Sequence, residues 1–174
     1  MPLLIRNIIR FIILMLLQMV VLNNMTTMGF SYAYLVPQVY VLFILFLPFE
    51  TPTWLSVMIG FVTGLIIDFS LNTEGLHAFA CTTLAYAKPS LTRALSPRDD
   101  YDFNSEPTFV DQGMAWFLTY SSILIFIHHF VLFFMEKLSW SNFLATLFTV
   151  VLSSVFTLII AIIYQFIVYP KKRT

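Results

Sequence analysis

Apolar residues occur in six runs along the chain, separated by short polar segments. A helix that crosses a membrane needs about 20 mainly apolar residues. We therefore predict an all-α, polytopic integral membrane protein that forms a single membrane domain over residues 1–174. Its six transmembrane helices are expected at about residues 8–23, 32–47, 54–69, 75–88, 113–135 and 143–169.

The fourth run, residues 76–87, is the weakest of the six. It is shorter than the roughly 20 residues of a usual span, and it includes His77, Thr82 and Thr83. It is therefore either a tilted span shielded by protein or a re-entrant segment. Six spans with a cytoplasmic N-terminus place eight of the nine Lys and Arg residues inside, whereas the best five-span arrangement places six inside. The positive-inside bias thus favours six spans with both termini in the cytoplasm.

Composition supports a membrane location. The chain is 59% hydrophobic and 10% charged, whereas soluble domains carry about 25% charged residues. The longest polar segment, residues 88–112, is too short to fold by itself without a metal or a disulfide, so a soluble catalytic or nucleotide-binding domain is excluded unless a partner supplies it. The net charge is zero, which gives no reason to expect nucleic-acid binding.

Two arginines, Arg6 and Arg10, precede the first apolar run, as in a signal peptide. No small-residue cleavage site follows, and further runs do, so we expect an uncleaved first helix. Gln18 interrupts this run and should face other helices, because an amide facing lipid would lack hydrogen-bond partners. Pro37 is expected in the first turn of the second helix, where proline is tolerated.

The most specific stretch runs from Pro48 to Pro89, and Pro48 and Pro52 bracket a turn at its start. Gly60, Gly64 and Asp68 follow at intervals of four residues, so they share one helix face. Two glycines four apart allow another backbone to approach closely. We favour packing within the chain over contact with another protein, because the motif does not say whose helix is the partner.

Asp68 is the only acidic residue well inside an apolar run. A charge at membrane depth suggests function by default. Its position near the outer end of the third helix equally suggests a structural carboxylate that fastens the turn at residues 69–75. His77 is its nearest polar candidate partner in the sequence.

Four further residues shape the fourth run and its two ends. Gly75 is expected to supply the turn before it, because glycine accepts positive φ. Pro89 is expected to end it, because the residue before a proline avoids helical dihedral angles. Tyr86 and Lys88 should then lie where an amphipathic ring and a snorkelling amine are favoured.

No catalytic, cofactor-binding or metal site is predicted. His128 and His129 are adjacent, so their side chains point about 100° apart on a helix and do not form a metal pair. Packing against other helices is the better interpretation. Cys81 is expected to be a small buried hydrophobic residue. Asp68 has no second intramembrane acid with which to form a catalytic dyad.

The central stretch resembles the rod shape-determining protein MreD family of the bacterial inner membrane. The resemblance rests on the order and spacing of short motifs over about a quarter of the chain. These are the proline-bracketed turn (Pro48, Pro52), Gly60-Phe61-x-x-Gly64-Leu65-x-x-Asp68, Gly75-x-x-Ala78 and Ala85-Tyr86-x-x-Pro89. Lys88 departs from the arginine expected beside the closing proline, but it keeps the charge.

The resemblance implies a non-enzymatic subunit of the cell-elongation complex that helps to maintain cell shape. Its implied partners are the shape protein MreC, the actin-like filament protein MreB, the RodA glycosyltransferase and a penicillin-binding transpeptidase. In this interpretation the glycine face and the Asp68 hinge form or support the partner-binding surface. The loop at residues 93–102 would meet proteins on the filament side.

A looser resemblance connects the six-helix layout to the substrate-binding S-components of energy-coupling-factor vitamin transporters. Asp68, Asn72, Glu74 and His77 could supply polar groups for a vitamin. However, the first helix lacks the alanine-type small-residue pair with which such proteins dock their transporter partner. A transport subunit is therefore the alternative function.

Overall fold

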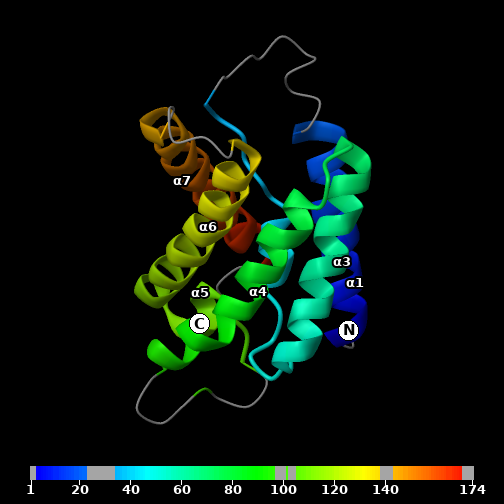
Figure 1. Cartoon of the computed structure of the whole chain (residues 1–174). Helices are drawn as coiled ribbons and strands as arrows, with labels where there is room; N and C mark the ends of the chain where they lie inside the picture. Colours follow the sequence, from blue (N-terminus) through cyan, green and yellow to red (C-terminus); the bar gives the residue numbers. More distant parts are fainter. Residues whose placement is uncertain (1–2, 23–33, 97–100, 102–104, 138–142, 170–174) are drawn as a thin grey trace.

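The computed structural model describes residues 3–22, 34–96, 101, 105–137 and 143–169, and every regular element within them is helical (Figure 1). The elements are α1 (Leu3–Leu16) with a π-helical continuation η1 (Leu17–Leu22), α2 (Val41–Leu45), α3 (Thr53–Leu71), α4 (Leu76–Ala94), α5 (Phe109–Gln112), α6 (Met114–Lys137) and α7 (Phe143–Val168). The predicted all-helical class is therefore confirmed.

Four described helices are long and apolar enough to cross a membrane. They are α1 with η1, counted over Ile5–Leu22, then α3, α6 and α7. Helix α4 has 19 residues but is less apolar than these four. The structure therefore supports a membrane protein with four candidate spans, and the six-span arrangement stays a prediction.

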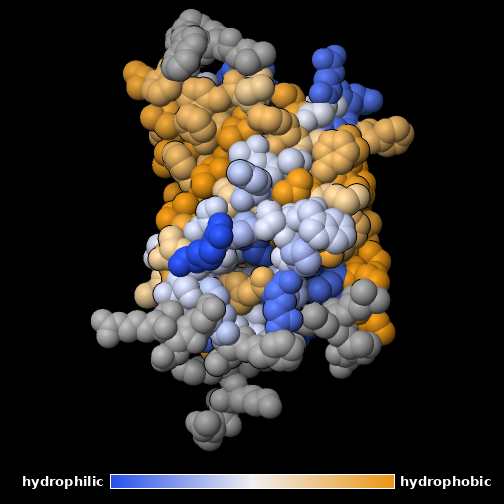
Figure 2. Space-filling model, turned by 60° about the horizontal axis from the view of Figure 1, so that its bottom comes forward, coloured by the Kyte–Doolittle hydropathy of each residue, from blue (hydrophilic) through white to orange (hydrophobic). Residues whose placement is uncertain are grey.

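The helices of each pair α3–α4, α4–α6 and α6–α7 run in opposite directions, whereas α1 and α3 run in the same direction (Figure 1). Helices α3 and α4 form the most extensive pair, α4 also packs on α6, and α6 packs on α7 (Figure 1). Side chains from the start of α1 and the end of α7 meet, because Arg10 donates a hydrogen bond to the hydroxyl of Tyr169. We call this the polar end of the molecule. Figure 2 shows hydrophilic residues gathered there and hydrophobic residues along the sides.

The predicted second helix, residues 32–47, is wrong in the part that the structure describes. Only Val41–Leu45 is α-helical, and residues 34–40 form turns and extended chain. The side chains from Val39 to Leu47 are all buried. We call residues 34–47 the buried segment. Residues 37–47 of this segment lie inside the bundle, so their apolar sequence reflects burial in protein and not contact with lipid, whereas Tyr34 and Val36 are exposed.

Polar side chains replace the helical hydrogen bonds at the start of the buried segment. The backbone N–H of Val36 donates to Ser153 Oγ at 2.9 Å, and that of Gln38 to Thr157 Oγ1 at 3.2 Å. The N–H of Val39 donates to Gln18 Oε1 at 2.7 Å. Non-helical backbone is tolerated at membrane depth only where protein satisfies its polar groups. Gln18 thus faces the protein interior, as predicted, but it binds the buried, non-helical backbone at Val39 and not another helix.

Three successive carbonyl groups at the other end of the buried segment are also satisfied by side chains. Tyr120 donates to the oxygen of Leu45 at 2.8 Å, Arg10 to that of Phe46 at 2.7 Å, and Lys88 to that of Leu47 at 2.6 Å. The last carbonyls of a helix lack intrahelical partners and carry partial negative charge. Three side chains from other elements therefore satisfy the carbonyl groups at the C-terminal end of the short helix α2 and of the two residues after it.

Two predictions about α4 are wrong. The helix does not end at Pro89 but continues to Ala94 with the proline inside it. Proline removes one helical hydrogen bond, but the helix is packed against α3 and α6, and Trp116 Nε1 donates to Leu95 O at its end. Lys88 is 4% exposed and does not reach toward water. Its amine turns inward because the carbonyl of Leu47 lies there.

Candidate functional site

The glycine face of α3 lies directly against α4 of the same chain. A methyl group added at Gly64 would lie 2.4 Å from Cα of Ala78, and one added at Gly60 would lie 2.8 Å from the carbonyl oxygen of Cys81. Both distances are far below van der Waals contact. The two glycines therefore let the helix backbones touch within the chain, which is the alternative that the sequence favours.

Asp68 holds the start of α4. Its Oδ1 accepts the backbone N–H of His77 at 3.0 Å, and its Oδ2 accepts that of Ala78 at 2.8 Å. The same Oδ1 accepts the hydroxyl of Thr73 at 2.5 Å and lies 2.9 Å from His77 Nδ1. Free N–H groups in the first turn of a helix favour a carboxylate partner. The carboxylate of Asp68, which lies on α3, thus acts as a cap for α4, a structural role that the sequence also allows.

The turn between the two helices uses left-handed backbone at both ends. Asn72 ends α3 with φ 54°, and Gly75 precedes α4 with φ 86°. Gly75 therefore supplies the turn that the sequence predicts, because a side chain is strained at this φ. We call Asp68, residues 72–75 and His77 the hinge.

The remaining predicted residues lie apart from the hinge. Tyr86 is 70% exposed on the outer side of α4, and Pro89 is half-buried one turn further along. Pro48 is half-buried after the buried segment, and Pro52 is exposed immediately before α3. The predicted set therefore does not form one site. Gly60, Gly64, Asp68 and Gly75 fix the α3–α4 pair, whereas the others lie along its edges.

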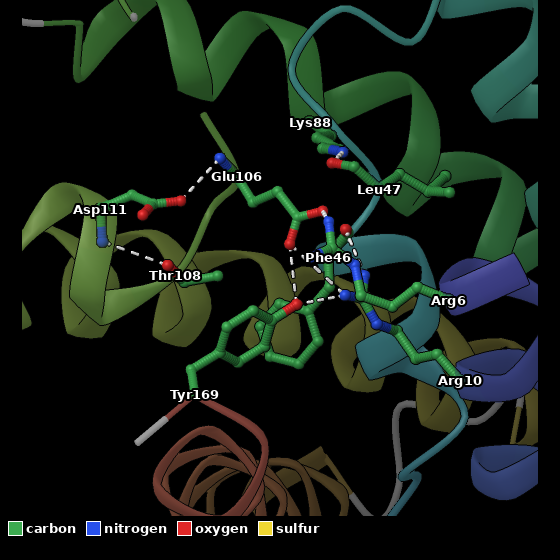
Figure 3. Close-up of polar contacts among 9 residues, drawn as sticks. All are labelled: Arg6, Arg10, Phe46, Leu47, Lys88, Glu106, Thr108, Asp111 and Tyr169. Carbon is green, nitrogen blue, oxygen red and sulfur yellow. Dashed lines mark hydrogen bonds and ion pairs between the residues drawn. The ribbon is translucent and has the colours of Figure 1, made fainter. Parts of the chain in front are cut away.

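A second cluster, at the polar end, was missed by the sequence analysis as a site. Its centre is Glu106, which is 3% exposed (Figure 3). The carboxylate pairs with Arg6, lies 3.5 Å from Arg10, and accepts the hydroxyl of Tyr169 at 2.7 Å. The Tyr169 hydroxyl thus accepts a hydrogen bond from Arg10 and donates one to Glu106. Residues from the first helix, the polar loop and the last helix are thereby joined.

Local hydrogen bonds hold the polar loop from Glu106 to Asp111. Asp111 accepts the backbone N–H of Glu106 at 3.0 Å, and Thr108 accepts that of Asp111 at 3.2 Å (Figure 3). Thr108 is the N-cap of α5. The nearby Lys88 and Arg10 bind carbonyl groups of the buried segment. In the sequence, Glu106 is only one acidic residue in a polar loop of mixed charge. Nothing near it indicates that its partners lie about 60 to 100 residues away along the chain.

The histidines of α6 are both buried and contact other elements. His128 Nε2 lies 3.2 Å from the hydroxyl of Tyr40, and His129 Nε2 lies 3.2 Å from Thr157 Oγ1. Cys81 is buried and its sulfur lies 3.8 Å from His128 Nε2. Among the described residues, no three His, Cys, Asp or Glu side chains gather as metal ligands. The predicted helix-packing role of the histidines agrees with these contacts.

Comparison with protein-family models gives one result. Residues 5–98 match the model of the rod shape-determining protein MreD, which covers more than half of the chain. The chain belongs to the MreD family. The matched region contains most of α1 and all of the buried segment, α3 and α4, and therefore the hinge and the glycine contacts. MreD proteins determine rod shape and lie in the membrane, so the predicted family and the general role in cell shape are confirmed.

Neither the curated proteins nor the solved structures contain a match to this chain. The looser resemblance to vitamin-transporter S-components therefore gains no support. Family membership likewise points to a shape-determining structural protein and not to a known enzyme family.

Proposed function

We propose that this MreD-family chain is a non-enzymatic, multi-pass inner-membrane subunit of the bacterial cell-elongation complex. It links the shape protein MreC, the actin-like MreB filament, the RodA glycosyltransferase and the penicillin-binding transpeptidase. The observation that carries this proposal is the family match over residues 5–98. Four apolar helices long enough to span a membrane support the location.

The polar end supports a cytoplasmic contact surface in this proposal. Glu106 joins the loop before α6 to Arg6 of α1 and to Tyr169 at the end of α7, and Asp111 holds the backbone of Glu106 within the loop. Eight of the nine Lys and Arg residues fall on this side in the six-span arrangement, which the positive-inside bias assigns to the cytoplasm. A loop held at fixed points loses less conformational entropy when a partner binds it.

The hinge and glycine contacts take an indirect part in partner binding. Gly60 and Gly64 are covered by α4, so they do not touch another protein. They fix the position of α4 and of its outward side chain Tyr86, which is 70% exposed. Aromatic side chains with large exposed area are favoured anchors in protein interfaces.

The first experiment is affinity capture of the tagged full-length chain from its native membranes in mild detergent, with partners identified by mass spectrometry. MreC and the wall synthases should be recovered. Tyr86→Ala should reduce recovery several-fold, whereas Ile167→Ala, which changes a side chain 73% exposed on α7, should not. Capture of an ATPase pair with a coupling subunit would contradict the proposal and favour transport.

Topology needs its own test. A single cysteine placed at Ser90 or Ser105, in an active variant lacking Cys81, should resist a membrane-impermeant maleimide added to intact cells or spheroplasts. It should react after the membrane is opened. A cysteine at Glu74, an exposed position within the hinge, should react before opening. Labelling of the 90–105 positions from outside would overturn the proposed orientation.

A further inference from the structure

Helix α7 is the most hydrophobic of the four candidate spans, yet its inward face is mainly polar. Large apolar side chains cover its outer surface. Lipid offers no hydrogen bonds, so each polar group on the inward face needs a partner inside the protein. The buried residues of α7 are Thr146, Thr149, Val150, Ser153, Ser154, Thr157, Ala161 and Gln165.

The buried segment accounts for two of these polar residues. Ser153 Oγ accepts the N–H of Val36, and Thr157 Oγ1 accepts that of Gln38. Gln165 is different. It is 0% exposed, and neither its Oε1 nor its Nε2 has a hydrogen-bond partner among the residues that the structure describes. A buried amide without partners is costly, so the side chain of Gln165 calls for a partner of another kind.

Ser121 on α6 has the same property. It is 0% exposed, and its hydroxyl has no partner within the described part of the chain. Hydroxyl groups inside helices commonly donate to the carbonyl group four residues earlier. Ser122 does so, because its Oγ donates to Leu118 O at 2.6 Å. The hydroxyl of Ser121 is therefore the one of this adjacent pair that is left to bind something else.

The packing of α6 on α7 brings these two side chains to one level of the bundle. The two helices run in opposite directions (Figure 1), and His129 Nε2 lies 3.2 Å from Thr157 Oγ1. Ser121 lies eight residues before His129, and Gln165 lies eight residues after Thr157. Equal steps along antiparallel helices reach the same level, here roughly 12 Å nearer the polar end at 1.5 Å per residue.

The surroundings of Gln165 on α7 suit a small polar guest. One turn before it, the buried residue is Ala161, whose side chain is a single methyl group. This methyl group occupies less volume than the leucines, isoleucines and phenylalanines elsewhere on α7. One turn after it comes Tyr169, whose hydroxyl contacts Arg10 and Glu106. The level of Gln165 therefore adjoins the polar cluster at the end of the bundle.

The chemistry of the unpartnered atoms matches water. The amide of Gln165 offers a donor at Nε2 and an acceptor at Oε1, and the hydroxyl of Ser121 can act as either. A buried water molecule typically makes about three hydrogen bonds to polar groups that are otherwise unsatisfied. None of the three atoms belongs to a charged side chain, so they offer an ion no opposite charge.

We propose that internal water is bound between Ser121 of α6 and Gln165 of α7. Gln165 Nε2 donates to the water oxygen, and water donates to Gln165 Oε1 or to Ser121 Oγ. The bound water joins the two helices at this level and extends the polar cluster of Tyr169 and Glu106 into the bundle. This inference goes beyond the proposed function and does not depend on it.

The test is magnetisation transfer from water in solid-state NMR of the full-length chain in lipid bilayers, with ¹⁵N in the glutamine side chains. Gln165 and Gln18 are a matched pair, with exposures of 0% and 2%. Gln18 donates to Pro37 O and accepts the N–H of Val39, so protein already satisfies its amide. The Gln165 amide should receive water magnetisation several-fold faster than the Gln18 amide. Equal rates would overturn the proposal.

A pair of serine variants locates the water. Ser121→Ala removes one side of the site and should slow the transfer to Gln165 at least two-fold. Ser122→Ala removes the neighbouring hydroxyl, which is bonded within its own helix, and should leave the transfer unchanged. An unchanged Gln18 signal shows that a variant keeps its fold. Equal transfer in the two variants would overturn the bridge between α6 and α7.

Gln165→Leu gives an independent measurement through the sign of its effect on Tm in detergent. Leucine has a similar volume but no polar atoms. If the Gln165 amide has no partner at all, its removal relieves an unpaid desolvation cost and Tm should rise. If water satisfies the amide, the variant loses these hydrogen bonds and leaves Ser121 short of a partner, so we expect Tm to fall. A rise in Tm would contradict the proposal.

Discussion

The α3–α4 pair and the buried segment solve the same physical problem in different ways. Both place backbone in an apolar interior, where every N–H and carbonyl group needs a partner. The pair uses helical hydrogen bonds and brings two helices together at Gly60 and Gly64. The buried segment has one short helix, Val41–Leu45, and takes its remaining partners from side chains of distant elements.

The two regions differ in how far apart in the sequence their stabilising residues lie. The pair is specified by residues close in the sequence, because the hinge between Asp68 and His77 joins the two helices. The buried segment depends on Arg10, Gln18, Lys88, Tyr120, Ser153 and Thr157. Its conformation therefore requires the rest of the bundle. Variants in the two regions should fail in different ways.

The largest effect is expected for Gly64→Ala. Alanine favours helix by about 1 kcal/mol over glycine, but the new methyl group would lie 2.4 Å from Cα of Ala78. We expect a loss of more than about 4 kcal/mol of stability or failure to accumulate in the membrane. Thermal unfolding in detergent measures the loss. Leu65→Ala, on the exposed side of the same helix, is the control, and an equally stable Gly64→Ala would refute the close contact.

A smaller but still large effect is expected for Arg10→Met. Arg10 is 3% exposed, donates to Phe46 O and lies beside Glu106. Removing one partner of a buried ion pair costs roughly 3–5 kcal/mol. The loss should loosen the buried segment, which amide hydrogen exchange at residues 41–47 would record. Arg93→Met, at an exposed arginine, should leave that exchange unchanged.

Asp68→Asn tests the hinge with an almost isosteric change. An amide offers one acceptor oxygen in place of the two that accept the N–H groups of His77 and Ala78. Loss of a charged hydrogen bond that leaves a buried donor unsatisfied costs about 1–3 kcal/mol. Exchange should rise in the first turn of α4 and not in the buried segment. Glu74→Gln is the matched control, and uniform exchange changes would argue against a local cap.

The smallest effect is expected for Ser153→Ala. The hydroxyl accepts the N–H of Val36 at 2.9 Å, so its removal leaves one backbone donor of the buried segment unpaired. We expect about 1 kcal/mol of lost stability and faster exchange of the Val36 amide. Ser122→Ala removes a hydroxyl bonded to its own helix at Leu118. If both variants behave alike, the side-chain support of the buried segment is weaker than described.

The sequence by itself determined the membrane class, the family and the helix face that Gly60, Gly64 and Asp68 share. Composition requires a lipid environment, and the spacing of Gly60, Gly64 and Asp68 places them on one face, because both features are local. The turn at Gly75 was also predictable, because glycine accepts the positive φ that it has there. The sequence around these glycines does not say whether they pack within the chain or against a partner. The contact of Gly64 with Ala78 was established only by the tertiary structure.

The tertiary structure decided what apolar runs alone do not distinguish. Residues 32–47 have the composition of a span, but side chains from five other elements replace their helical hydrogen bonds. Local sequence rules predicted that the amine of Lys88 reaches toward water and that Pro89 ends the helix. In the structure, Lys88 instead binds the carbonyl group of Leu47, and the packed helix α4 continues through Pro89. Glu106 is recognised as the centre of a polar cluster only in the structure, where Arg6 and Tyr169 both contact its carboxylate. Long-range hydrogen bonds carry this information, and no sequence window contains both partners.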